Sequence, residues 1–324
     1  MKTVFVINPA AGKRKNVELL VNRIKAVIKE LGVKAEIHIT RAVGDASRFV
    51  REFHEKNGKT RFIACGGDGT LNEVLNGVMG ADECEVGVLP IGTGNDFCRN
   101  FGKELCFDSI SHQIYGQSAK CDAIKYSTHI NGEHKQGYCA NMFNIGFDCN
   151  VADLTAAVKQ KTWVRGSLAY FVSILITLIK KKCTRLKIHI DGKEAHDGRL
   201  LLTSVANGCY CGGGIKSNPL ACVNDGLINV NIIKNVSRLR FISLLPYYMK
   251  GTHLKLRGIE KIILCKKCRK ISIMPYDEKI RLCIDGEITD AGTTEFEIIH
   301  NAFNFVVPGE KCGDCTLEQT ECKC

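Results

Sequence analysis

The sequence predicts two domains: an N-terminal α/β domain built on a parallel sheet and a C-terminal domain that is mainly an antiparallel β-sandwich. Strand-like and helix-like patterns alternate through residues 1–120, as in parallel sheets with crossover helices. From residue 121 to 307, short strand-like segments recur with few helical patterns, which is typical of antiparallel sheets. Residues 308–324 form a cysteine-rich tail.

The α/β domain is predicted from elements that follow one another closely. The strand-like runs are "TVFVIN", "KAEIHIT", "RFIACG" and "EVGVLP". Residues 16–31 carry apolar side chains at helical spacing and end at Gly32, and "GDASRFVREFHEK" reads as a second helix with Asp45 near its start. "GTLNEVLNGV" continues the third strand into a third helix. This order predicts that the turns "NPAAG", "TRAVGDA", "GGDGT" and "GTGND" lie together at the carboxyl edge of the sheet, where α/β domains bind ligands.

The second domain is predicted from a dense series of short strands and contains one long apolar helix. The strand-like segments include "CDAIKY", "YCANMFNIGF", "TRLKIHIDG", "RLLLTSVANG", "GLINVNII", "KISIMP" and "KIRLCIDGE". Ser167 to Lys182 is apolar on nearly all sides but shorter than a bilayer span. We interpret it as a buried core helix, with docking on anionic lipid through its apolar face and terminal lysines as the alternative.

The composition limits the function classes. The chain has 324 residues, of which 45% are hydrophobic and 24% charged, as in an ordinary globular protein. The net charge of +11 suggests an anionic partner, such as a nucleotide or an anionic membrane surface. Without a long basic block, nucleic acid is not expected as a partner. The apolar run Val4 to Ile7 is too short for a signal peptide, which predicts a cytoplasmic location.

The eighteen cysteines are most simply reduced thiols. Four of them, Cys312, Cys315, Cys322 and Cys324, offer the thiolate quartet of a zinc site in the tail, but their loop is short. Free or redox-active thiols are the alternative. We interpret Cys265 and Cys268 as neighbours near a strand end rather than as metal ligands.

The stretch "RFIACGGDGTLNEVLNGV" has the strand, glycine turn and helix of a phosphate-binding site. It lacks the Gly-Lys-Ser/Thr of a P-loop and the glycine spacing of a dinucleotide fingerprint. Asp68 could simply cap the helix. However, a second glycine turn carries Asp96, and two carboxylates at one edge repel each other unless they share a cation. Mg²⁺ prefers oxygen ligands, so these aspartates predict a metal–nucleotide site.

Together, "NPAAG", "GGDGTLNEVLNGV" and "PIGTGNDFCRNFG" resemble the diacylglycerol kinase catalytic-domain family, particularly its soluble bacterial lipid kinases. "NPLACVNDGLINV" and "LCIDGE" follow in the family's order. The resemblance implies a fold like that of NAD kinases, with the active site in the cleft between the two domains. It also implies an ATP- and Mg²⁺-dependent transferase of phospholipid biosynthesis, a kinase that phosphorylates a lipid hydroxyl. Diacylglycerol, which would give phosphatidic acid, is the favoured acceptor.

The resemblance also implies roles for individual residues. Asp68 is implied in catalysis, and Asp285 or Glu287 is the implied base, the choice between them being open. An Asp-Gly hairpin turn is the plain alternative for "IDGE". The implied metal ligands are the Asp225 carboxylate and the main-chain oxygens of Cys222 and Leu227, with Asp68 and Asp96 acting through water. The implied ATP contacts are Asn8, Pro9, Ala10, Ala11, Gly12, Thr40, Gly66, Gly67, Asp68, Gly69, Thr70, Leu71, Asn72 and Thr93.

Several alternatives stay open at this point. The acceptor could be another lipid, such as phosphatidylglycerol or a sphingoid base, or a soluble molecule such as NAD. A nucleotide- or lipid-binding protein without activity is a rival from another class. The expected partners are ATP, the lipid substrate and, peripherally, an anionic membrane surface. A homodimer is compatible with the sequence but is not indicated by any pattern in it.

Overall fold

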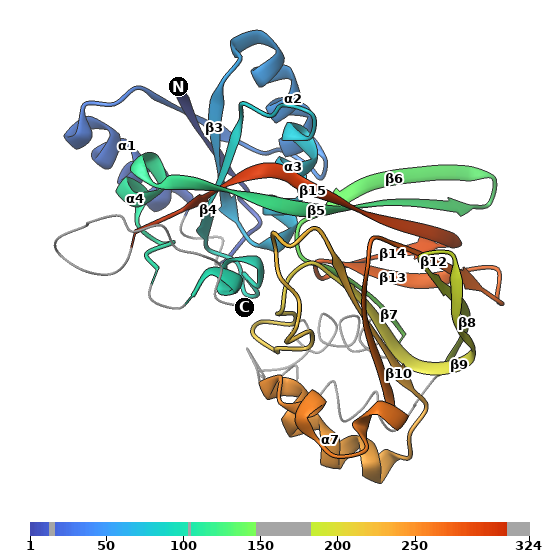
Figure 1. Cartoon of the computed structure of the whole chain (residues 1–324). Helices are drawn as coiled ribbons and strands as arrows, with labels where there is room; N and C mark the ends of the chain where they lie inside the picture. Colours follow the sequence, from blue (N-terminus) through green and yellow to red (C-terminus); the bar gives the residue numbers. More distant parts are fainter. Residues whose placement is uncertain (13–16, 103–104, 147–182, 310–324) are drawn as a thin grey trace. The chain divides into compact units, whose positions relative to one another are not determined.

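The computed structural model describes residues 1–12, 17–102, 105–146 and 183–309 (Figure 1). The predicted helix Ser167–Lys182 and the cysteines of the tail lie outside these residues. The chain divides into two compact units. Of the described residues, the first unit contains Met1–Ala123 and the segment 300–309, and the second contains Ile124–Ile299.

The first unit is built on a parallel sheet. Its strands lie in the order β2, β1, β3, β4 and β15, and each neighbouring pair is parallel. The bounds are β2 Ala35–Ile39, β1 Lys2–Ile7, β3 Thr60–Gly66, β4 Glu85–Pro90 and β15 Thr293–Val307. The first four match the strands predicted from the sequence, so the parallel α/β prediction is confirmed.

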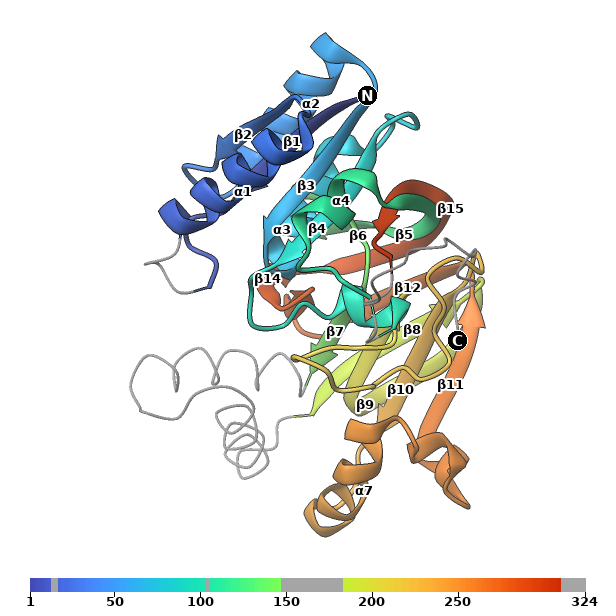
Figure 2. The same cartoon turned by 90° about the vertical axis from the view of Figure 1, so that its left-hand side faces the viewer.

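Helices cover both faces of this sheet, and they can be followed in Figure 2. Because side chains alternate along a strand, Phe62 and Ile63 face opposite sides. The helices are α1 Val17–Leu31, α2 Asp45–Asn57, α3 Asp68–Val78, the 3-10 helix η2 Phe97–Phe101 and α4 Ile110–Tyr115. Ile63 belongs to a cluster formed with α1 and α4, whereas the ring of Phe62 contacts Phe53 of α2 edge-on.

The second unit is an antiparallel β structure, as predicted. The long strand β9 (Lys193–Ala206) pairs antiparallel with three others: β7 (Met142–Gly146), β8 (Thr184–Ile190) and β10 (Ile228–Lys234). The remaining strands are β5 Gln117–Ile130, β6 Glu133–Cys139, β11 Ile263–Cys268, β12 Lys270–Pro275, β13 Ile280–Ile284 and β14 Glu287–Ala291. The pairs β10–β11, β12–β15, β12–β8, β13–β14, β13–β7 and β5–β6 are all antiparallel.

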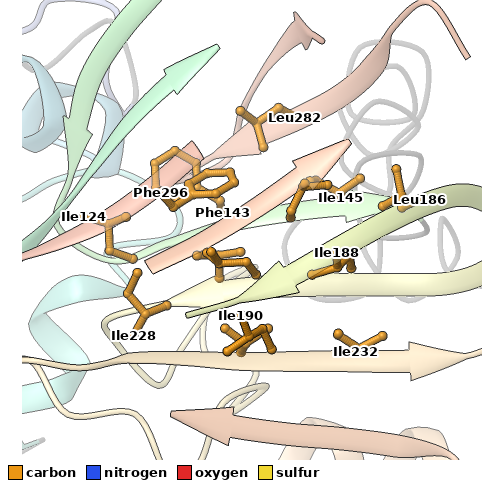
Figure 3. Close-up of a cluster of buried hydrophobic side chains, with 14 of the residues drawn as sticks. Ile124, Phe143, Ile145, Leu186, Ile188, Ile190, Ile228, Ile232, Leu282 and Phe296 are labelled. Atoms are coloured by element: carbon orange, nitrogen blue, oxygen red, sulfur yellow. The ribbon is translucent and has the colours of Figure 1, made fainter. Parts of the chain in front are cut away.

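The core of the second unit consists of inward-facing aliphatic and aromatic side chains from most of these strands. Phe143 packs edge-on against Phe296, with ring centroids 4.9 Å apart. Figure 3 shows these rings surrounded by isoleucine and leucine side chains of the neighbouring strands, Ile145 and Leu282 among them. This packing holds the strands in place, including the strand ends at which polar side chains lie.

Two features of the second half depart from the simple sequence pattern. β5 and β15 have residues in both units, and β15 pairs with β4 through Asn304 and Phe305. The predicted domain boundaries at residues 120 and 307 therefore do not include the return of the chain to the first unit through β15. The helix α7 (Arg238–Lys250), followed by the 3-10 helices η3 (His253–Lys255) and η4 (Ile259–Lys261), was not predicted.

The described ranges contain no helix that combines the length and the apolar character needed to cross a membrane.

Candidate functional site

The predicted turns meet at the carboxyl edge of the parallel sheet. Asn8 N–H donates to the Cys65 carbonyl at 3.1 Å, and Thr40 N–H donates to the Ile7 carbonyl at 2.9 Å. Gly92 N–H donates to the Gly66 carbonyl at 3.1 Å. These bonds join the ends of four strands, so the co-location predicted from the order of the elements is confirmed.

The glycines of "GGDGT" are required by close contacts. A Cβ on Gly66 would overlap the Thr70 side chain, and Gly67 lies against the Gly92 main chain. Asn8 Nδ2 donates to Thr70 Oγ1 at 3.1 Å, which ties the first loop to the start of α3. Because Gly67 at the N-cap has no side chain, no N-cap side chain occupies the amides of the first turn. This end of α3 therefore presents donors and the positive end of a helix dipole.

Asp68 joins the two glycine loops. Its carboxylate accepts hydrogen bonds from Asn95 N–H at 2.7 Å and Asp96 N–H at 2.8 Å. Burial raises the pKa of Asp68 above its ordinary value, while these amide donors act in the opposite direction. A Cβ on Gly94 would overlap the same carboxylate, so a glycine is needed there. Asp68 is thus neither a simple helix cap nor an isolated charge.

Asp96 is buried beside Asp68 and pairs with an arginine of its own loop. Arg99 Nε lies 3.4 Å from Asp96 Oδ1, and an Arg99 guanidinium N–H donates to the Gly94 carbonyl at 3.1 Å. Asn95, in the left-handed conformation with φ 53°, donates from Nδ2 to the Gly92 carbonyl at 2.9 Å. These bonds hold the loop in one shape.

The chemistry of this edge fits a magnesium ion bound through water. The groups are all oxygens: two carboxylates and the Asn95 amide oxygen, which is buried with no hydrogen-bond partner. Both oxygens of Asp68 already accept an N–H, so the fit favours water-mediated over direct coordination by this residue. Mg²⁺ commonly retains several waters.

The turn after β2 is organised by Asp45. This buried carboxylate accepts the Arg41 N–H at 3.0 Å and lies 3.1 Å from His38 Nε2. The Arg41 amide, followed by the His38 and Arg48 side chains, lowers the pKa of Asp45 despite its burial. The bonds hold the turn that follows Thr40. The sequence pattern indicates only that Asp45 lies near the start of a helix.

The other residues implied in ATP binding differ in exposure. Leu71 is buried in the core, so only its main chain can face a ligand. Gly12 has φ +67°, and its Cα side faces the Ile91 carbonyl, where a Cβ would come within 2.8 Å. Ala10 and Thr93 are exposed, whereas Pro9, Ala11, Gly69 and Asn72 are half-buried at the same edge. The contacts of these residues with ATP stay a prediction.

In the second unit, "IDGE" is the turn of the hairpin β13–β14. Asp285 and Gly286 have φ values of 46° and 94°, the left-handed pair that two-residue hairpins use. The turn is also more than a turn. Asp285 Oδ1 accepts the Met142 N–H at 2.9 Å, and Oδ2 accepts the Cys139 thiol at 3.1 Å. Glu287 begins β14 and is exposed.

Cys139 is a hydrogen-bond partner of Asp285 that the sequence did not reveal. It is fully buried, and burial, reinforced by the Asp285 carboxylate, raises the pKa of its thiol well above the ordinary value. The thiol therefore stays protonated and acts as a donor. Nothing in the sequence distinguishes Cys139 from the other cysteines, since its partner lies 146 residues away along the chain.

The loop implied in structural metal binding carries an ion pair. Asp225 Oδ1 accepts the Leu227 N–H at 3.0 Å, and Oδ2 lies 2.6 Å from Lys267 Nζ. Cys222 is half-buried, and its thiol bonds to the Asn224 side chain. A cation held directly by Asp225 would have to displace the Lys267 ammonium. As arranged, these residues do not fit a directly bound metal.

No group of three or more His, Cys, Asp and Glu side chains in the described part of the chain is arranged to hold a metal ion. Cys265 and Cys268 lie three residues apart on β11 and so point to opposite faces of the strand. The interpretation of this pair as neighbours on a strand therefore agrees with the structure. The zinc prediction concerns tail residues outside the described ranges.

The described site residues form two sets, one in each unit. The first unit contains Asp68 and the glycine loops that are expected to bind a nucleotide. The second unit contains Asp285 with Cys139 and Met142. Asn207 supports the second set, because its Nδ2 donates to the Ala140 carbonyl at 2.8 Å. That the two sets face each other across a cleft stays a prediction.

Comparisons with known proteins cover nearly the whole chain. Residues 2–126 match the diacylglycerol kinase catalytic domain, and residues 141–307 match the YegS C-terminal NAD kinase beta sandwich-like domain. A diacylglycerol kinase of Bacillus subtilis (strain 168) is 28% identical over 315 residues, covering 95% of this chain and 96% of the relative. A Yersinia pestis (strain Pestoides F) protein named "Probable lipid kinase YegS-like" is 32% identical over 212 residues, 64% of this chain and 67% of the relative.

A crystal structure of a diacylglycerol kinase from Bacillus anthracis str. Sterne has the same fold. Its TM-score is 0.65 at 22% identity, with 94% of this chain and 96% of that chain covered. At this identity the likeness concerns the fold alone.

Proposed function

The chain belongs to the diacylglycerol kinase catalytic-domain family and is a lipid kinase, and on this premise we propose that it transfers the γ-phosphoryl group of ATP to the hydroxyl of diacylglycerol. The resemblance inferred from the sequence motifs is thereby confirmed at the level of the family. The acceptor, ATP and Mg²⁺ are the parts that we propose.

The observation that carries the proposal is the hydrogen-bonded junction of the two glycine loops through Asp68. This junction holds the first turn of α3 and the loop after β4 in fixed positions. Phosphoryl transfer depends on positioning and on stabilisation of charge at the phosphoryl oxygens, and preorganised main-chain amides supply both. A loop pair that had to order on binding would lose part of this effect.

We assign the base to Asp285 rather than to Glu287. A base must be oriented toward the hydroxyl from which it takes the proton. The Met142 amide and the Cys139 thiol hold the Asp285 carboxylate in one orientation, and a carboxylate oxygen can accept more than one hydrogen. Glu287 is exposed and lies on the first residue of a strand.

In the reaction, Asp285 takes the proton from the acceptor hydroxyl, and the oxygen of that hydroxyl forms a bond to the γ-phosphorus. The bond from that phosphorus to the β–γ bridging oxygen breaks, which gives the phosphorylated lipid and ADP. The amides at the start of α3 donate to phosphate oxygens. A bound Mg²⁺ would neutralise phosphate charge, and Asp68 and Asp96 would hold its water ligands.

The setting of the reaction follows from its acceptor. A diacylglycerol resides in a membrane, so we propose a cytoplasmic protein that contacts the anionic membrane surface peripherally. The charge of +11 supports this partner. A homodimer stays a prediction, and nucleic acid has no part in the proposal.

The test is transfer of labelled phosphate from ATP by the purified chain, with Mg²⁺ or with a chelator. The acceptors are diacylglycerol, phosphatidylglycerol, a sphingoid base and NAD. We expect label in phosphatidic acid, only with Mg²⁺. Preferred labelling of another lipid would replace the acceptor, and NAD labelling would overturn the lipid assignment.

Two variants test the base assignment in the same assay. Asp285→Asn keeps the shape of the side chain but removes the basic oxygen, and we expect the transfer rate to fall by at least about a hundredfold, the usual contribution of a general base. Glu287→Gln should retain most of the rate. The reverse result would move the base to Glu287.

A further inference from the structure

The helix α7 has apolar side chains on two opposite faces. Figures 1 and 2 show it beyond the end of β10 in the second unit. Its inner face carries Phe241, Leu244, Leu245 and Tyr248, which pack against a buried cluster that includes Ile233. This packing accounts for one apolar face and leaves the other to be explained.

The outer face carries Leu239, Ile242, Pro246 and Tyr247, which we call the α7 stripe, together with the exposed hydroxyl of Ser243. The apolar residues are spaced by three, four and one, so they form one stripe along the helix. Leu239 is 82% exposed, Ile242 48% and Tyr247 45%, and no side chain of α7 is classed as buried. Single exposed apolar residues are common on protein surfaces, but a stripe along one helix marks an interaction site.

The charge around the stripe has one sign. Residues 226–259 contain no aspartate or glutamate. The same segment carries six exposed cations: Lys234, Arg238, Arg240, Lys250, Lys255 and Arg257. At 100° per residue, Arg238 and Arg240 lie on either side of the stripe, and Lys250 lies at its end. Apolar side chains bordered by cations are the pattern of helices that lie in the interface of an anionic bilayer.

We propose that the α7 stripe docks this protein on anionic lipid bilayers. The inference rests on the proposed function in one respect, that the acceptor is a membrane lipid, and it names the surface that reaches that membrane. A second copy of the chain fits less well, because pairing two such faces would bring twelve cations together while residues 226–259 of both copies contain no acid. Lipid phosphates supply the missing negative charge, and acyl chains accept the apolar side chains.

The test measures binding to vesicles without ATP. The full chain is floated with phosphatidylcholine vesicles and with vesicles that also contain phosphatidylserine, and we expect binding to the second kind. Each arginine near an anionic surface contributes about fivefold in partitioning, so Arg238→Gln/Arg240→Gln should weaken binding about 25-fold. Leu239→Ser/Ile242→Ser/Tyr247→Ser should weaken it at least about tenfold, since three apolar groups no longer insert.

Matched controls lie on the first unit. Leu19→Ser/Tyr115→Ser removes exposed apolar side chains, and Lys25→Gln/Lys29→Gln removes exposed cations. These variants should bind vesicles as the unaltered chain does. Since the altered side chains of α7 are exposed, thermal unfolding should change little, which separates lost docking from lost folding.

The outcomes distinguish the surface from the reaction. If the α7 variants bind like the unaltered chain, or the controls lose binding equally, the docking surface is overturned while lipid phosphorylation can still be observed. If vesicles are bound through α7 but no lipid is phosphorylated, the proposed function fails and the surface stands. If the α7 variants instead convert a dimer to a monomer in light scattering and bind vesicles unchanged, the stripe is a subunit interface.

Discussion

The Asp68 carboxylate offers the sharpest test of how the site is held together. In Asp68→Ala, the amides of Asn95 and Asp96 lose their acceptor. A buried donor left without a partner costs about 1–3 kcal/mol. Two such losses would give about 2–6 kcal/mol, but two effects reduce the sum. Burial raises the pKa of Asp68, so removing the carboxylate also removes its desolvation cost, and Asn95 is only half-buried, so water can reach its amide.

We therefore expect the free energy of unfolding to fall by about 1–3 kcal/mol, which leaves the protein folded at 25 °C. Phosphoryl transfer should be abolished, because the loop after β4 is no longer tied to α3. The direct measurement is amide hydrogen exchange. Exchange of Asn95 and Asp96 should accelerate by about tenfold for each 1.4 kcal/mol of lost protection.

The control is Asp108→Ala, which removes an exposed aspartate of the same unit and should change the unfolding free energy by less than about 0.5 kcal/mol. Unchanged exchange at Asn95 and Asp96 in Asp68→Ala would refute the junction. Full kinase activity with accelerated exchange would refute the step from junction to catalysis. Asp68→Asn, which keeps one acceptor oxygen, should give intermediate exchange.

Three further substitutions test the surroundings of Asp285, of Asp225 and of His253. Cys139→Ala removes a hydrogen-bond donor from the Asp285 carboxylate, so it should lower the transfer rate about fivefold and move the acidic limb of the pH–rate profile to higher pH. Cys139→Ser should restore both the rate and the profile. The control Cys268→Ala, which alters a cysteine of the same core, should leave the profile unchanged. Lys267→Met should strengthen binding of Mg²⁺ to the Asp225 loop by up to about fivefold in calorimetry, and unchanged affinity would show that the ammonium does not compete. Burial lowers the pKa of His253, so as the pH falls the unfolded chain binds a proton at this histidine before the folded chain does. The contribution of neutral His253 to stability is therefore complete above a pH of about 6.5 and decreases as the pH falls below that value. A His253→Leu variant that kept the same dependence of melting temperature on pH would contradict this.

The parallel sheet was predictable because each of its elements is short, regular and local in sequence. β4 begins and ends where the apolar run "EVGVLP" does, and α3 begins at Asp68 directly after the glycine turn. Once these elements form parallel crossovers, their turns must share an edge. The approximate place of the glycine loops that are expected to bind a nucleotide therefore follows from the order of the elements along the chain.

The helix α7 could not be predicted by the same reasoning. Hydrophobic periodicity identifies a helix by contrast between an apolar and a polar face, and α7 is apolar on both. Pro246 within it further weakens the helical pattern. Its inner face is defined only by packing against β-strand residues such as Ile233, and its outer face only by what the fold leaves uncovered.

The sequence by itself determined the family and the parallel and antiparallel halves, and it supplied the loops and acids that are proposed for the site. Tertiary structure alone decided the partners: the Asn95 and Asp96 amides for Asp68, the Cys139 thiol for Asp285, and the Lys267 ammonium for Asp225. The physical reason is that motifs are read along the chain, whereas a hydrogen bond depends on which donor the folded backbone brings within about 3 Å. Main-chain amides and a buried thiol carry no mark in a sequence until the fold places them.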